Sequence, residues 1–167
     1  MVKESAMRHV MLGIGLVVLA CFSGCGDTPS TATAAKSIRQ DFTPAVWLTD
    51  LGTAQAQAAK EHKPIMADFT GSDWCGWCIK LKEEVFDTPE FSAWAKTHVI
   101  LLEVDFPHDK AQSPELTRQN TQLAETYKIE SFPTILFMSA DGTKQGSLGY
   151  IEGGPASWIA AADAIVK

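Results

Sequence analysis

The chain has 167 residues, a formal net charge of −6 and an apolar fraction of 46%. This length supports one ordinary domain with an N-terminal extension, and the apolar fraction is enough for a hydrophobic core. The acidic balance provides neither the basic surface typical of nucleic-acid binding nor a polybasic membrane patch. We therefore expect no nucleic-acid partner.

Residues 1–24 follow the pattern of a secretory signal peptide. Lys3 and Arg8 precede an apolar run at 10–20, and small residues and cysteines follow it. This run is too short to cross a bilayer comfortably as a permanent helix. We therefore expect the domain to lie outside the cytoplasm, in a bacterial periplasm, or else to be secreted.

The end of this signal offers two cysteines for lipid attachment. The segments that end at Cys25 and at Cys21 both resemble a bacterial lipobox, in which the lipidated cysteine becomes the new N-terminus. The small residues before Cys25 make it the first choice. A lipid there would anchor the protein to a membrane, and the alternatives are plain cleavage with secretion or an uncleaved anchor.

The rest of the chain divides into a tether and a domain. Residues 25–42 are rich in Thr, Ser, Ala and Pro, which predicts a flexible tether, and the folded domain is expected over 43–167. Apolar periodicity, caps and turns predict, in chain order, a short strand at 42–48, a helix at 50–62, a strand at 64–69, a helix at 75–86, a helix at 89–97, a central strand at 99–105 buried on both faces, a helix at 114–127, a strand at 135–138, its antiparallel partner at 144–150 and a last helix after Pro155. This order implies an α/β fold with a central mixed sheet covered by helices on both faces.

A pair of cysteines, Cys75 and Cys78, stands at the start of the helix predicted at 75–86. Residues at this spacing lie side by side, and Cys75 faces the unpaired N–H groups and the positive end of the helix dipole. This setting stabilises a thiolate, which is the reactive form of cysteine, although the charge of Asp73 opposes it. We interpret the pair as a redox dithiol that cycles between thiol and disulfide.

Two other interpretations of this pair are weaker. A zinc site needs four ligands, but no cysteine follows Cys78 and the four histidines never fall in a paired ligand spacing. We therefore expect no metal. A purely structural disulfide is disfavoured because a loop this short gains little stability by closure.

The chain from about residue 44 to 167 resembles the thioredoxin superfamily. It is most similar to the secreted disulfide-exchange branch that includes the C-terminal domain of the periplasmic reductase DsbD. Three features carry the resemblance: the strand that ends with Asp68-Phe69, the motif Trp74-Cys75-Gly76-Trp77-Cys78, and Phe132-Pro133-Thr134 before an apolar strand. The resemblance implies the thioredoxin fold and a thiol-disulfide oxidoreductase that needs no metal or organic cofactor.

The resemblance also implies a role for each site residue. Cys75 would be the exposed attacking thiolate, and Cys78 the buried thiol that releases the mixed disulfide. Pro133 would be cis and lie against the cysteine pair, and Phe132 would offer an apolar contact to an extended substrate.

Asp68 has two interpretations, and so does the arrangement of the two motif tryptophans. Asp68 matches a buried aspartate that helps to deprotonate the second cysteine, but the lysine that the family places near it is missing, so burial predicts a raised pKa. The alternative is a strand-end aspartate bonded to the backbone. Trp74 and Trp77 either both form a substrate-facing rim, or Trp74 packs beneath the motif loop and only Trp77 is exposed.

We therefore expect a monomeric, extracytoplasmic thiol-disulfide oxidoreductase that acts mainly as a reductant. Its partners would be protein dithiol or disulfide substrates and an upstream redox protein. One alternative is an oxidase or isomerase of the same fold, with a higher redox potential. The other is a non-catalytic thioredoxin-like module that only binds partners.

Overall fold

The computed structural model describes residues 43–166. The predicted signal peptide, both candidate lipidation cysteines and the predicted tether lie outside these residues. The elements, in chain order, are α1 (Leu51–Glu61), β1 (Ile65–Thr70), α2 (Gly76–Leu81), the π-helical turn η1 (Lys82–Phe86), α3 (Pro89–His98), β2 (Ile100–Asp105), α4 (Pro114–Tyr127), β3 (Thr134–Met138), β4 (Lys144–Leu148) and α5 (Gly154–Asp163).

The strands form one mixed sheet in the order β2-β1-β3-β4. β1 runs parallel to β2 and antiparallel to β3, and β4 pairs antiparallel with β3. The mixed sheet is as predicted, but the central position predicted for residues 99–105 is wrong, because β2 lies at an edge. A nearly continuous apolar run arises at an edge when helices cover both faces of the sheet.

The outer edge of β2 is partly covered by the segment before α1. The N–H of Leu48 donates to the carbonyl of Leu101 at 2.9 Å, and the N–H of Glu103 donates to the carbonyl of Leu48 at 2.8 Å. This bridge is all that forms of the strand predicted at 42–48, within the residues described. It satisfies backbone groups that an edge strand would otherwise expose.

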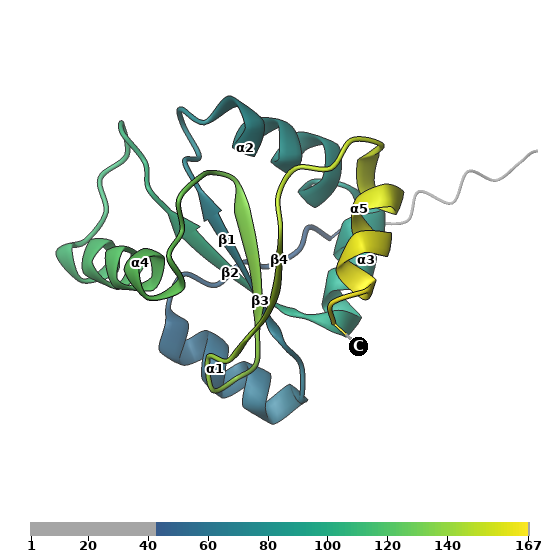
Figure 1. The fold of residues 1–167 in the computed structure, drawn as a ribbon, viewed down its shortest axis with the longest axis horizontal. Helices are drawn as coiled ribbons and strands as arrows, with labels where there is room; N and C mark the ends of the chain where they lie inside the picture. The colour runs from purple at the N-terminus through teal and green to yellow at the C-terminus, as the bar shows by residue number, and fades with distance from the viewer. Residues whose placement is uncertain (1–42, 167) are drawn as a thin grey trace, which may run out of the picture. The chain divides into compact units, whose positions relative to one another are not determined.

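Side chains alternate across the sheet and build two separate cores. On one face, Met66 of β1 and Phe137 of β3 pack with α2, η1, α3 and α5 around the fully buried Trp158. On the other face, Ala67 and Leu136 pack with α1 and α4. Figure 1 shows α3 and α5 together on one side of the sheet and α1 and α4 on the other.

The helix predicted at 75–86 is not α-helical throughout. After α2 it widens into η1, where the N–H of Asp87 donates to the carbonyl of Lys82, five residues earlier, at 2.8 Å. Leu81, Val85 and Phe86 are all buried. The wider turn lets the two consecutive residues at 85 and 86 both face the core, which a regular 3.6-residue period does not favour.

The predicted helix starts are confirmed where caps signalled them. The hydroxyl of Thr88 accepts from the N–H of Phe91 at 3.3 Å, and the hydroxyl of Ser113 accepts from the N–H of Leu116 at 3.2 Å. Both helices carry proline in the first turn, as expected for this position. Across residues 43–166, none of the helices combines the length and the apolar character needed to cross a membrane.

Candidate active site

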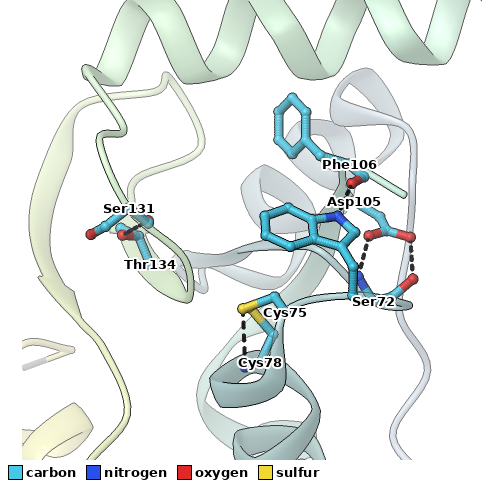
Figure 2. Close-up of a disulfide and its surroundings, with 8 residues drawn as sticks. Ser72, Cys75, Cys78, Asp105, Phe106, Ser131 and Thr134 are labelled. Carbon is cyan, nitrogen blue, oxygen red and sulfur yellow. Dashed lines mark hydrogen bonds between the residues drawn. A yellow bond between two sulfur atoms is a disulfide. The ribbon is translucent and has the colours of Figure 1, made fainter. Parts of the chain in front are cut away.

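The cysteine pair forms a disulfide at the start of α2. Cys75 and Cys78 are bonded, with their Cα atoms 5.2 Å apart. Cys75 is the N-cap of the helix, and its sulfur accepts from the N–H of Cys78 at 3.3 Å. Figure 2 shows the pair at this helix start, which is where unpaired N–H groups and the helix dipole favour negative charge on sulfur.

Both cysteines are buried in the disulfide form. Cys75 is 7% exposed and Cys78 is 4% exposed. The expectation of an exposed Cys75 is therefore wrong for this state, whereas the buried position of Cys78 is as expected. The reason is local: as the N-cap, Cys75 turns its side chain back over the first turn instead of outward.

The turn before β3 lies beside the motif. The Phe132–Pro133 peptide bond is cis, as the resemblance implied. Across this turn, the hydroxyl of Thr134 donates to the carbonyl of Ser131 at 2.7 Å. The ring of Phe132 meets the ring of Trp74 edge-on, with centroids 6.0 Å apart. Residues about 60 positions apart in the chain thus form one surface next to Cys75.

Trp74 lies on this surface and not beneath the motif loop. It is 44% exposed, its indole N–H donates to the carbonyl of Phe106 at 2.8 Å, and its ring stacks on that of His108 at 4.6 Å. A backbone hydrogen bond and a stacked neighbour fix the orientation of the ring while one side stays open. The interpretation of Trp74 as part of an exposed rim therefore holds geometrically.

Trp77 lies in a second aromatic group. It is 58% exposed and meets Tyr150 at a centroid distance of 5.2 Å. The ammonium group of Lys80 lies 5.3 Å from the Trp77 ring and 5.1 Å from the Tyr150 ring, within cation–π range. Glu84 completes the group, because its carboxylate accepts from the Tyr150 hydroxyl at 2.6 Å and lies 3.7 Å from the Lys80 ammonium.

Asp68 is buried in β1, where the positive charge of Lys82 only partly offsets the acids around it. Strand alternation places it with Met66, on the face of the sheet that α2 covers. Its Oδ1 atom has no hydrogen-bond partner. Burial, together with the negative charges of Glu103 and Asp105, raises the pKa of Asp68 to about 8. The carboxyl group is therefore largely protonated near neutral pH.

The loop that leads into the motif is held by hydrogen bonds that the sequence analysis did not predict. Ser72 donates from its N–H and its hydroxyl to the two carboxylate oxygens of Asp105, at 2.9 and 2.6 Å (Figure 2). The carboxylate of Asp73 accepts from the N–H groups of His108 and Asp109, at 3.0 and 2.8 Å. These two hydrogen bonds lower the pKa of Asp73 and direct its carboxylate toward the loop that follows β2.

The sequence carries only part of the signal for this contact, because polar residues stand at the ends of two predicted strands. Asp105 ends β2 and Thr70 ends β1, and the two strands are parallel. The residues that follow the carboxyl ends of parallel neighbours meet at one edge of the sheet, which is a common place for functional loops. The order of the strands, which the sequence leaves open, decides that these two ends are neighbours.

Comparison with known proteins agrees with this geometry. The family model of the thioredoxin-like domain matches residues 51–159. The chain belongs to the thioredoxin-like family. It is 36% identical over 114 residues to the disulfide bond reductase DsbH of Chlamydia pneumoniae, covering 68% of this thioredoxin-like chain and 69% of that relative.

Solved structures support the same assignment. A structure of a DsbH oxidoreductase is similar with a TM-score of 0.74 at 32% identity, covering 79% of this chain and 92% of that one. The oxidised C-terminal domain of DsbD from Neisseria meningitidis is similar in fold, with a TM-score of 0.53 at 23% identity, covering 72% of this chain and 99% of that one. The predicted thioredoxin fold is confirmed, and the chain is a thioredoxin-like thiol-disulfide oxidoreductase with a Cys-Gly-Trp-Cys disulfide.

Proposed function

We propose that this thioredoxin-like protein is an extracytoplasmic reductase of protein disulfides. The observation that carries the proposal is the Cys75–Cys78 disulfide at a helix start, flanked by exposed rings. A relative over two thirds of this chain is named a disulfide bond reductase, which supports the reducing direction. The partners would be substrate proteins and an upstream dithiol protein.

The proposed reaction runs through two thiol-disulfide exchanges. In the reduced enzyme, the Cys75 thiolate attacks one sulfur of a substrate disulfide, forms a mixed disulfide and releases the other substrate sulfur as a thiolate. Cys78, as a thiolate, then attacks the sulfur of Cys75 and releases the second substrate thiolate. Two electrons pass to the substrate and the disulfide seen here forms. An upstream dithiol returns the enzyme to the reduced state.

The surrounding residues suit these steps. Trp74, Trp77 and Phe132 would contact the substrate, and Pro133 would hold the turn that faces it. Because Cys75 is only 7% exposed, we propose that a partner must pack on this surface to reach the sulfur. Asp68, protonated in the disulfide state, is placed on the α2 face and would exchange a proton with Cys78 as that thiol forms or is lost.

A reductase assay tests the enzymatic part of this proposal. The wild-type protein is expected to accelerate insulin reduction by dithiothreitol, whereas Cys75→Ser should show only the uncatalysed rate. Cys78→Ser should turn over poorly and accumulate a mixed disulfide with insulin. Equal activity of all three proteins would contradict the enzyme and favour a binding module.

Redox equilibration with glutathione tests the direction. A reductase is expected near the thioredoxin potential of about −270 mV, whereas a value near about −120 mV, as in DsbA, would indicate an oxidase. A value near about −180 mV, as in protein disulfide isomerase, would indicate an isomerase.

We also propose that cleavage occurs directly before a lipidated cysteine, which anchors the tether to a membrane. Residues 1–24 are removed if Cys25 carries the lipid, and residues 1–20 are removed if Cys21 carries it. The support is the order of charged, apolar and small residues in the sequence. Labelling with radioactive palmitate in a bacterial host should mark the wild-type protein. Cys25→Ser should lose the label if Cys25 is the site, and Cys21→Ser should lose it if Cys21 is.

A further inference from the structure

A pocket of about 290 Å³ lies next to the motif, between the loop after β2 and the first turns of α4. Part of its lining is aromatic and consists of Trp74, Phe106 and His108, which we call the rim. Another part is polar and consists of Gln112, Thr117 and Asn120, which we call the floor. Pro107 and Lys110 complete the lining. We call this cavity the Trp74 pocket. Its volume is at the low end for ligand sites, which suits one side chain better than a cofactor.

The walls of the Trp74 pocket are held in place. Asp73 accepts two backbone N–H groups from residues 108 and 109, at 3.0 and 2.8 Å, and so anchors the loop to the motif. His108 is thereby positioned to stack on Trp74, with the ring planes 8° apart. Lys110, also on this loop, donates to the Ser72 hydroxyl at 2.9 Å. The cavity is thus bounded by fixed side chains, which lowers the ordering cost of binding.

The floor of the pocket is partly hydrogen-bonded within the protein. One side-chain N–H of Gln112 and one of Asn120 donate to the carbonyl of Asp105, at 3.1 and 2.9 Å. The hydroxyl of Thr117 donates to the carbonyl of Ser113 at 3.1 Å, so its oxygen can still accept. An occupant that fits has a flat apolar body for the rim and a polar tip for the floor, as tyrosine has.

One lining residue of the pocket is the sequence neighbour of Cys75. Trp74 forms a wall of the pocket and directly precedes Cys75, so a substrate segment whose sulfur meets Cys75 passes this wall within a few residues. We propose that the Trp74 pocket binds one aromatic side chain of the protein substrate, located near the attacked cysteine. This inference rests on the proposed function and adds a preference for disulfides that have an aromatic residue close by in sequence.

Two matched peptides test the preference. Each is an extended peptide with one cysteine held as a mixed disulfide with thionitrobenzoate, and Tyr or Ala stands two residues from that cysteine, on either side. The reduced protein is mixed in excess, and release of thionitrobenzoate gives the second-order rate constant. With the aromatic residue on one of the two sides of the cysteine, the tyrosine peptide is expected to react about 2- to 10-fold faster than the alanine peptide. This range corresponds to the interaction energy of an aromatic pair.

Two variants of α4 locate the preference. Thr117→Trp fills the pocket and should bring the ratio of the two rate constants close to one. Thr121→Trp is the matched control, because its hydroxyl also donates to the carbonyl four residues earlier, at 2.9 Å, but it does not line the pocket. It should keep the wild-type ratio. Circular dichroism checks that both variants fold. His108→Ala removes one wall of the pocket and should also abolish the preference for the tyrosine peptide.

The outcomes separate this inference from the function on which it rests. If wild-type protein releases thionitrobenzoate from neither peptide, the oxidoreductase function fails, and the pocket proposal with it. If both peptides react at equal rates on either side of the cysteine, only the pocket proposal is overturned. It is also overturned if Thr117→Trp and His108→Ala both keep the preference, or if Thr121→Trp loses it.

Discussion

Asp68 on β1 is paired in register with Glu103 on β2, so two carboxyl groups occupy neighbouring positions on the same face of the sheet. Burial and the charge of Asp105 raise the pKa of Glu103, and burial with both neighbouring acids raises that of Asp68 further. The family resemblance implied a lysine near this position, and the chain has none on β2. The Asp68 carboxyl group therefore keeps its proton near neutral pH and does not form a buried ion pair with a lysine on β2.

This pairing predicts how stability depends on pH. The folded-state pKa of Asp68 is about 8, above its usual value of 3.8, so between these values the folded protein keeps a proton that the unfolded chain has lost. The contribution of Asp68 to the free energy of unfolding should therefore be greatest below about pH 4 and decrease as the pH rises to about 8. Asp68→Asn should remove most of this slope and stabilise the oxidised protein at pH 9 by a few kcal/mol, on the order set by the pKa change.

Urea unfolding at pH 5 and pH 9 measures both effects. Asp109→Asn is the control, because it removes the same charge from an exposed position and should leave the slope as in wild type. A small slope should remain in Asp68→Asn, since the pKa of Glu103 is also raised. Identical slopes in wild type and Asp68→Asn would contradict the buried proton.

A second prediction concerns the close approach of the loop and Trp74. A Cβ atom added at Gly71 would lie 2.7 Å from the indole nitrogen of Trp74, so the ring would have to move. That ring is held by its bond to Phe106 and by stacking on His108, so Gly71→Ala should cost about 1–3 kcal/mol. Gly76→Ala is the control, because a Cβ there meets nothing within 4 Å.

Thermal unfolding of the two alanine variants provides this comparison. Tryptophan fluorescence should change in Gly71→Ala as the indole is displaced. If Gly71→Ala is as stable as Gly76→Ala and has the wild-type spectrum, the ring is not confined as described.

A third prediction concerns the link between Ser72 and Asp105. Two hydrogen bonds to one carboxylate, at 2.9 and 2.6 Å, join the motif loop to the end of β2. Ser72→Ala keeps the N–H bond to Asp105 but loses the hydroxyl bond, together with the Lys110 contact to that hydroxyl, and Asp105→Ala loses both bonds to the carboxylate. A double-mutant cycle should therefore show a coupling of about 1–3 kcal/mol for the hydroxyl–carboxylate pair. Denaturant unfolding of the four proteins measures it, and additive effects would show that this bond contributes nothing.

A fourth prediction compares two tryptophans. Trp158 is fully buried and packs against Phe86, Phe91 and Phe137, so Trp158→Ala should destabilise the domain by about 3–5 kcal/mol. Trp77 is 58% exposed, so Trp77→Ala should change stability by less than about 1 kcal/mol. Urea unfolding measures both variants. Similar losses in the two would mean that Trp77 has a structural role that its exposure does not indicate.

The sequence alone determined the chemistry and most of the local structure. Cysteines three residues apart at a helix start can form a disulfide whatever surrounds them, because the helix itself sets their spacing. Caps such as Thr88 and Ser113 are likewise local, since a side chain bonds to a backbone group three residues away. For this reason the predicted helices match those observed within a few residues, apart from the widened turn at η1.

Only the tertiary structure decided which distant residues surround that disulfide. Strand order decides that β2 lies at an edge and that Asp68 is buried opposite Glu103. It also decides that Trp74 meets Phe106 and His108. Apolar runs and alternation specify which faces are buried, but they do not specify which strands are neighbours. The aromatic surface beside the disulfide is therefore a property of long-range packing, whereas the cysteine pair is a property of one short helix.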